Sequence, residues 1–127
     1  MLFAGADPGA RNTGVAIMDD KRFVMWAEFA DPIEAMVVIR THAAMDPSMV
    51  MIVEAFIGSG RLNKRRIRTI EIVGYLFFAC EELGLEVVRQ VNQVRLPSVR
   101  LVPAAIRGKD ERAAAAHVLA YRERHGV

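Results

Sequence analysis

The chain has 127 residues, of which 53% are hydrophobic and 25% charged, and its formal net charge is +2. This length suits a single domain over residues 1–127, and the composition excludes a disordered protein. No apolar run is long enough to span a membrane, and Asp7 interrupts the N-terminal run, so we expect neither a membrane partner nor a secretory leader. Cys80 is the single cysteine, which excludes an internal disulfide and a thiolate zinc cluster. We expect a cytoplasmic protein.

The stretch Leu2–Ile17 holds the first candidate functional residue. An apolar run ends at Asp7, a Pro-Gly turn follows, and a second apolar run begins at Thr13. Pro8 biases Asp7 toward an extended conformation, and Gly9 lets the backbone turn and approach a bulky ligand. The pattern predicts a β-hairpin with Asp7 at the lip of a buried strand, facing solvent. An ordinary turn is the alternative, because Asp-Pro-Gly is common turn chemistry.

The remaining elements alternate between strand and helix patterns. In chain order we predict a strand over Lys21–Phe29, a helix from Asp31-Pro32 to about Met45, a strand over Met49–Val53, a loop over Ala55–Asn63, a helix over about Leu62–Leu83 stopped by Gly84, a strand over Leu85–Val91, an irregular segment over Asn92–Arg107 and a helix over about Lys109–Arg124. The first three strands are expected to form an antiparallel meander.

A second carboxylate ends a second buried strand. Met49–Val53 is a short, continuous apolar run typical of a strand buried on both faces, and Glu54 follows it. If this strand lies parallel to the first, Asp7 and Glu54 emerge at the same edge of the sheet. Ligands of open α/β sheets bind at that edge.

The long helix begins with a basic cluster and continues with an apolar part. Arg61, Lys64, Arg65, Arg66 and Arg68 fall within eight residues. A local basic patch on a near-neutral protein suits a bound polyanion, and the alternative is a solvated helix start. Ile70–Cys80 is apolar nearly all round, which predicts burial on every side, so we expect a homodimer through Ile70–Leu83. Cys80 is then either a small core residue or a group near the interface that cross-links two copies when oxidised.

The last helix carries further candidates. Asp110 and Glu111 lie in its first turn, where acids also complement the helix dipole. His117 is most simply a partly buried packing residue or a surface group. Three carboxylates, Asp7, Glu54 and Asp110, converging in one cleft repel one another unless cations lie between them. Oxygen-only ligands with open positions suit Mg²⁺ or Mn²⁺, and two such ions activate water at a phosphodiester.

This arrangement resembles the ribonuclease H-like superfamily, and within it the chain is similar to RuvC-type Holliday-junction resolvases, especially the compact phage versions. The matching stretches are Gly5-Ala6-Asp7-Pro8-Gly9 with Thr13-Gly14, Ile52-Val53-Glu54-Ala55-Phe56, Glu71-Ile72-Val73-Gly74-Tyr75 and His117-Val118-Leu119-Ala120-Tyr121. The resemblance implies an α/β fold with a five-stranded mixed sheet, an antiparallel three-strand meander plus two parallel strands, and helices on both faces. It also implies a dimeric, metal-dependent endonuclease that makes paired, symmetric nicks in four-way DNA junctions, in a bacterial or phage-infected cell.

The resemblance assigns Asp7 and Glu54 as metal ligands, with two further ligands three residues apart at the start of the last helix. Asp110 fits the first of these, and the second falls on Ala113, which has no donor atom. Either the chain is an inactivated variant, or Glu111 reaches in, or Asp110 is the later ligand in a shifted register. A missing ligand slows cleavage and leaves junction binding intact.

The basic residues are expected to contact DNA phosphates; these are Arg61, Lys64, Arg65 and Arg66, together with Arg95 and Arg100 from another loop. Three other readings stay open. They are a ribonuclease H acting on hybrids, a catalytically silent protein that binds branched DNA, and an actin-like nucleotide-binding fold. The last normally needs two such domains around one nucleotide, and 127 residues hold one.

Overall fold

The computed structural model describes residues 1–55 and 61–127. In chain order the elements are β1 Phe3–Asp7, β2 Thr13–Met18, β3 Phe23–Phe29, α1 Pro32–Met45, β4 Val50–Ala55, α2 Lys64–Glu82, β5 Glu86–Val91, α3 Asn92–Arg95, the 3₁₀ helix η1 Leu96–Leu101 and α4 Lys109–His125. The predicted order of strands and helices is confirmed. Most of the predicted loop after Ala55 lies outside the described residues.

The sheet has five strands in the order β3-β2-β1-β4-β5. The β1–β2 and β2–β3 pairs are antiparallel, and β1–β4 and β4–β5 are parallel. The predicted meander with two added parallel strands is therefore confirmed. Because β1 and β4 are adjacent and parallel, Asp7 and Glu54 do leave the sheet at one edge.

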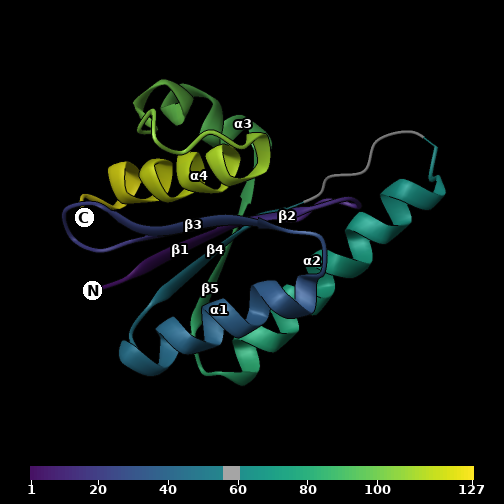
Figure 1. Ribbon diagram of the computed structural model, residues 1–127, viewed down its shortest axis with the longest axis horizontal. Helices are drawn as coiled ribbons and strands as arrows, with labels where there is room; N and C mark the ends of the chain where they lie inside the picture. Colours follow the sequence, from purple (N-terminus) through teal and green to yellow (C-terminus); the bar gives the residue numbers. More distant parts are fainter. Residues whose placement is uncertain (56–60) are drawn as a thin grey trace.

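Helices cover both faces of the sheet (Figure 1). On one side α1 and α2 pack over Met51 and Val53 of β4, and on the other α4 packs over Val50 and Ile52. These alternating side chains are all buried, which confirms that β4 is covered on both faces. The two apolar layers hold the strand ends in place, so a charged group can be fixed at the carboxyl edge.

Small residues let α4 lie very close to the sheet. Ala113, Ala114, Ala115 and Ala116 are all buried in this helix. A Cβ atom added at Gly5 in β1 would overlap the Ala114 carbonyl, so no larger residue fits there without moving α4. The helix start is therefore held against the edge where β1 ends.

The segment after β5 is more regular than predicted. Pro97 and Pro103 suggested an irregular chain, but α3 and η1 occupy its first part, with proline at the start of η1, where a missing N–H costs no hydrogen bond. Arg112 of α4 ties the segment down by donating to the backbone carbonyls of Val99, Val102, Pro103 and Ile106. A guanidinium with five donors suits such a cluster of carbonyls.

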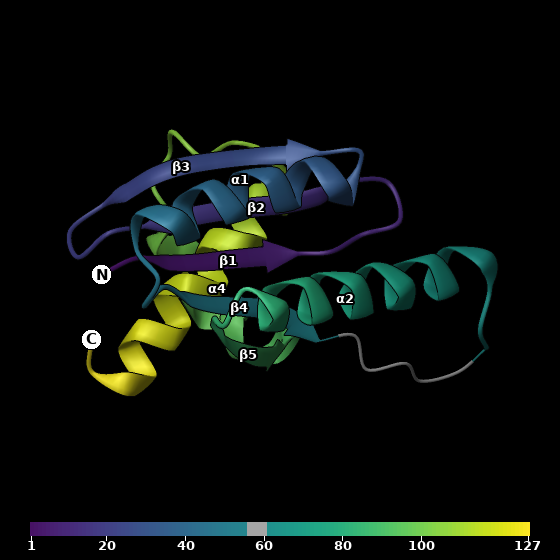
Figure 2. The same ribbon diagram turned by 90° about the horizontal axis from the view of Figure 1, so that it is seen from below.

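Helix α2 projects past the carboxyl edge of the sheet with its basic N-terminal half (Figure 2). Asn63 caps it by accepting from the Arg66 N–H, and Gly84 follows its end with a φ of 75°. Ile72, Leu76 and Cys80 face the core. The apolar half is thus buried along one side only.

Cys80 does not lie at an outer surface. Its side chain is fully buried, and its sulfur lies 3.9 Å from the sulfur of Met36 in α1. Burial raises the pKa of the Cys80 thiol to about 12. The expectation that Cys80 lies near an interface where it cross-links two copies is therefore wrong, and the core reading is confirmed. None of the helices in the described ranges is long and apolar enough to cross a membrane.

Candidate active site

Three polar side chains form a row across the carboxyl edge of the sheet. The register pairs Ala6 with Val53 and Glu54 with Gln90, so Asp7, Glu54 and Gln90 follow one another on β1, β4 and β5. Alternation along each strand turns all three toward α4 rather than toward α1 and α2. Sequence reasoning found the first two members of this row, and Gln90 was missed.

Helix α4 supplies the facing stripe. Asp110, Ala113 and His117 are spaced by three and four residues, which places them on one side of the helix. His117 is fully buried, so the expectation of a partly buried or surface group is wrong. The available signal was its spacing from Asp110, because two α4 residues seven apart face the same layer.

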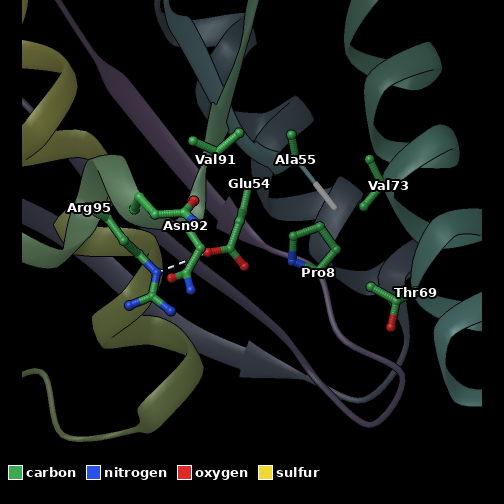
Figure 3. Close-up of a pocket in the computed structure, with 9 residues that line it drawn as sticks. Pro8, Glu54, Ala55, Thr69, Val73, Val91, Asn92 and Arg95 are labelled. Atoms are coloured by element: carbon green, nitrogen blue, oxygen red, sulfur yellow. Dashed lines mark hydrogen bonds and ion pairs between the residues drawn. The ribbon is translucent and has the colours of Figure 1, made fainter. Parts of the chain in front are cut away.

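Glu54 is held by donors from two other elements. Arg95 Nε lies 2.9 Å and His117 Nε2 lies 3.0 Å from Glu54 Oε1. Figure 3 shows Arg95 reaching Glu54 beside the end of β5. Burial opposes ionisation of Glu54, but hydrogen bonds from His117, Asp7 and Arg95 outweigh it and hold its pKa below the usual range. Glu54 is therefore a carboxylate.

Asp7 has the opposite electrostatic environment. Burial, hydrogen bonding to Glu54 and the negative charges of Glu54 and Asp110 raise the pKa of Asp7 to about 9, although Arg95 works against this. Asp7 is half-buried, so the expectation that it faces solvent without burial is only partly right. Asp7 therefore holds its proton beside the ionised Glu54, because two adjacent negative charges would repel.

Asp110 completes the acidic group, and Glu28 holds the backbone beneath it. The Asp110 N–H donates to Glu28 Oε1 at 2.9 Å, which links the start of α4 to β3. Burial and the charges of Glu28 and Glu54 raise the pKa of Asp110, and Lys109 opposes them. Asp110 lies on the same side of the site as Asp7, because its backbone packs against Gly14, the residue paired with Asp7 between β1 and β2.

Glu111 points to a different task. Its Oε1 accepts a hydrogen bond from the Gly108 N–H at 2.8 Å and closes the first turn of α4. This is the capping role of an acid at the third helical position. We therefore leave Glu111 out of the proposed metal ligands.

The residues fit Mg²⁺ or Mn²⁺ in a restricted way. Among residues 1–55 and 61–127, no group of three or more His, Cys, Asp or Glu side chains is arranged to hold a metal ion. Asp7 instead interacts electrostatically with each of the other two acids, Glu54 and Asp110. Mg²⁺ is commonly held by one or two carboxylates, with water and substrate phosphate completing its shell. Glu54 and Asp110 add negative charge around Asp7, so a cation is electrostatically favoured beside these acids.

Two cavities flank the carboxylates. One, of about 300 Å³, lies beside Glu54 and is lined by Pro8, Thr69, Val73, Asn92 and Arg95 among others (Figure 3). The second, of about 230 Å³, is lined by Asp7, Arg95, Val99, Lys109, Arg112 and Ala113. Ala113 thus lines the same cavity as Asp7, where the resemblance places a further ligand.

The predicted phosphate-binding residues lie in three places. Arg61, Lys64 and Arg65 are exposed at the projecting end of α2, where Arg66 donates to the Arg61 carbonyl at 2.9 Å. Arg100 is exposed on η1. Arg95 lies within the site against Glu54, which the sequence alone did not indicate.

Comparison with solved structures identifies the fold. The chain superposes on Thermus thermophilus RuvC in complex with a Holliday junction substrate with a TM-score of 0.79 and 16% identity, over 99% of this chain and 96% of that one. Another Thermus thermophilus RuvC structure superposes with a TM-score of 0.74 and 15% identity, over 99% of this chain and 97% of that one. The fowlpox virus Holliday junction resolvase superposes with a TM-score of 0.58 and 15% identity, over 98% of this chain and 99% of that one. No family model and no curated protein matches the sequence. The chain has the ribonuclease H-like fold of RuvC-type resolvases.

Proposed function

We propose that this protein binds four-way DNA junctions as a homodimer and nicks them by divalent-metal-dependent hydrolysis. The observation that carries the proposal is the placement of three acids at one edge: Asp7 and Glu54 end the adjacent parallel strands β1 and β4, and the Asp110 backbone packs against Gly14, the residue paired with Asp7. The likeness of the whole chain to solved junction resolvases supports branched DNA as the substrate. At these identities the likeness by itself carries only the fold.

The site residues divide the work. Asp7 and Glu54 would hold one Mg²⁺ or Mn²⁺, and Asp7 with Asp110 would hold a second. Bound ions would supply an activated water and charge stabilisation at the scissile phosphate. Arg95, which lines both cavities, is placed to orient a phosphate entering either of them.

The projecting half of α2 would carry the DNA backbone. It extends beyond the carboxyl edge, so its exposed cations lie on the same side of the molecule as the carboxylates (Figure 2). Contacts of this kind set affinity and register without reading base sequence.

The outer face of α2 supports a homodimer. Ile67, Ile70 and Phe78 are exposed, Phe78 at 63%, and a Cβ atom added at Gly74 would meet nothing within 4 Å. Phe77 is different, because Arg89 lies 4.0 Å above its ring. An exposed apolar stripe around an open glycine suits a second α2 helix, and two copies would place two sites on one junction.

The test is a gel assay of labelled four-way junctions with Mg²⁺, with Mn²⁺ and with EDTA. We expect paired nicks at symmetric positions with either metal and none with EDTA, whereas Asp7→Asn binds the junction without cutting it. Linear duplex of the same sequence is the control for branch selectivity. Preferential cutting of an RNA–DNA hybrid would point to the ribonuclease H reading instead.

A catalytically silent junction-binding protein is the second candidate. Ala113 favours it, because the residue lies beside Asp7 in the cavity and offers no ligand atom. Tight junction binding without nicking in either metal would select this function.

A further inference from the structure

Gln90 and His117 form a buried polar pair beside Glu54. Gln90 is 4% exposed and His117 is fully buried, and they come from β5 and α4. Burying polar groups is costly unless each finds a hydrogen-bond partner. These two find partners in each other and in Glu54, so the pair is built into the site rather than into the apolar layers.

The hydrogen bonds fix which nitrogen of His117 carries the proton. Gln90 Nε2 lies 3.0 Å from the His117 carbonyl oxygen and 2.9 Å from His117 Nδ1. A carbonyl oxygen only accepts, so the Gln90 group facing it is the NH₂, which also donates to Nδ1. Nδ1 is then an acceptor without a proton, and the ring N–H lies on Nε2.

We propose that His117, oriented by Gln90, is a positioning residue that fixes the Glu54 carboxylate by donating its Nε2–H to Oε1. Arg95 donates to the same oxygen, so these two donors leave Oε2 as the oxygen available to Asp7 and a cation. This inference rests on the proposed function in one respect, since the carboxylate that it positions is a proposed metal ligand.

His117 is the more permanent of the two supports. The side chain of Arg95 is 20% exposed and lines both cavities, so a phosphate can compete for it. His117 has no exposed side-chain surface, and its imidazole is enclosed between α4 and the sheet. Hydrogen-bond partners behind a metal ligand typically change metal affinity or activity by about 10–100-fold when removed.

Nitrogen-15 spectra of the imidazoles test the proton placement without metal or DNA. The chain has 3 histidines, so His42 and His125 serve as internal controls. At neutral pH we expect His117 to show a protonated Nε2 and an unprotonated Nδ1. We also expect Glu54→Gln to shift the His117 Nε2 signal and to leave those of His42 and His125 in place. A proton on His117 Nδ1, or no response to Glu54→Gln, would overturn the inference.

Calorimetric titration with Mn²⁺ tests the positioning role. His117→Leu is expected to weaken Mn²⁺ binding about 10–100-fold, and Gln90→Leu to weaken it in the same direction. His117→Gln should restore much of the affinity, because its terminal amide N–H reaches Glu54 from a similar distance. His125→Leu, near the exposed end of α4, is the matched control and should match the wild type.

The outcomes separate this inference from the proposed nuclease. Unchanged Mn²⁺ affinity in folded His117→Leu would overturn the positioning role while leaving metal-dependent nicking intact. Absence of Mn²⁺ binding in the wild type would count against the nuclease, and the imidazole spectra would still decide whether His117 holds Glu54. If His117→Leu does not fold, His117→Gln and the spectra carry the test.

Discussion

Gly14 of β2 lies directly against the backbone of Asp110 at the start of α4. A Cβ atom added at Gly14 would overlap the Asp110 carbonyl group and crowd the Glu111 nitrogen. The neighbours are backbone atoms, so no side-chain rotation relieves the overlap. The glycine after the Asp-Pro-Gly turn thus fixes the distance between α4 and the strand that pairs with β1.

Gly14→Ala is therefore expected to displace the first turn of α4 and carry Asp110 away from Asp7. Overpacking of this kind costs about 1–3 kcal/mol of unfolding free energy. Metal-dependent nicking should fall more than stability does. Ala44→Ser is the control, because it also adds one heavy atom but at an exposed position of α1, away from the site and from α2. Urea unfolding and junction nicking check both variants, and a fully active Gly14→Ala would contradict this role for the glycine.

Local sequence patterns were sufficient for Asp7 and Glu54 but not for the rest of the site. An acid at the end of an apolar run can be recognised from the sequence, and parallel pairing of two such strands brings their two acids to the same edge. Gln90 carries no such signal, because its place beside Glu54 depends on the register of β4 and β5. Register is a long-range property, and a polar residue in a strand reads equally well as an outward-facing one.

The α4 side of the site shows a similar division. Asp110 was found through its place in the first turn and through the resemblance, whereas His117 was hidden within an alanine-rich helix. Arg95 was expected among the phosphate contacts, yet the helical turn of α3 directs it to Glu54. The proline positions suggested an irregular segment after β5. They could not show that Arg112 binds a cluster of carbonyls there, because that contact joins two separate elements, α4 and the segment after β5.

Asp7→Asn is expected to stabilise the metal-free protein at about pH 8 and to abolish its stabilisation by Mn²⁺. The pKa of Asp7 in the folded protein is about 9, whereas the pKa of an exposed aspartate is 3.8. The contribution of this proton to the free energy of unfolding is complete below pH 3.8 and is lost as the pH rises toward 9. Asparagine has the shape of aspartate without its charge, so we expect the free energy of unfolding in EDTA to rise by about 0.5–2 kcal/mol.

Urea unfolding in EDTA at about pH 5 and about pH 8 measures this difference. The advantage of Asp7→Asn should grow with pH, and Mn²⁺ should stabilise only the wild type. Glu123→Gln, at an exposed carboxylate of α4, is the control and should follow the wild type. A variant that is less stable than the wild type at about pH 8 in EDTA would show that the site is not strained by its carboxylates.

Charge removal at Arg65 and Arg66 is expected to weaken junction binding and flatten its salt dependence. Each lost phosphate contact lowers the slope of log affinity against log salt by about 0.9 for duplex DNA. The matched control is Arg124→Ala, an exposed arginine at the opposite end of α4 from Asp110. Binding titrations at several salt concentrations measure the slope, and an unchanged slope in Arg65→Ala/Arg66→Ala would remove α2 from the DNA interface.

Phe78→Glu is expected to convert the protein to a monomer. Phe78 is 63% exposed on α2, and a charge there opposes burial against a second copy without disturbing the core. Phe77 is the contrast, because it is partly buried beneath Arg89. Sedimentation of both proteins reports the oligomeric state, and Val24→Glu on exposed β3 serves as a matched control. A wild type that sediments as a monomer would contradict the dimer proposal.

Ala113→Asp is expected to accelerate Mg²⁺-dependent nicking while lowering the stability of the metal-free protein. Ala113 is 6% exposed and lines the cavity that contains Asp7, so a carboxylate there joins a group in which burial and neighbouring negative charges already raise the pKa of Asp7. Adding another acid increases the repulsion in EDTA and adds a ligand when metal is present. Ala113→Asn, which adds similar volume without charge, separates the electrostatic effect from crowding. Single-turnover nicking rates measure the gain in activity, and urea unfolding in EDTA and in Mg²⁺ measures the loss of stability. If Ala113→Asp cuts no faster than the wild type, the missing-ligand explanation for this position is wrong, and Asp7, Glu54 and Asp110 are the complete acidic set.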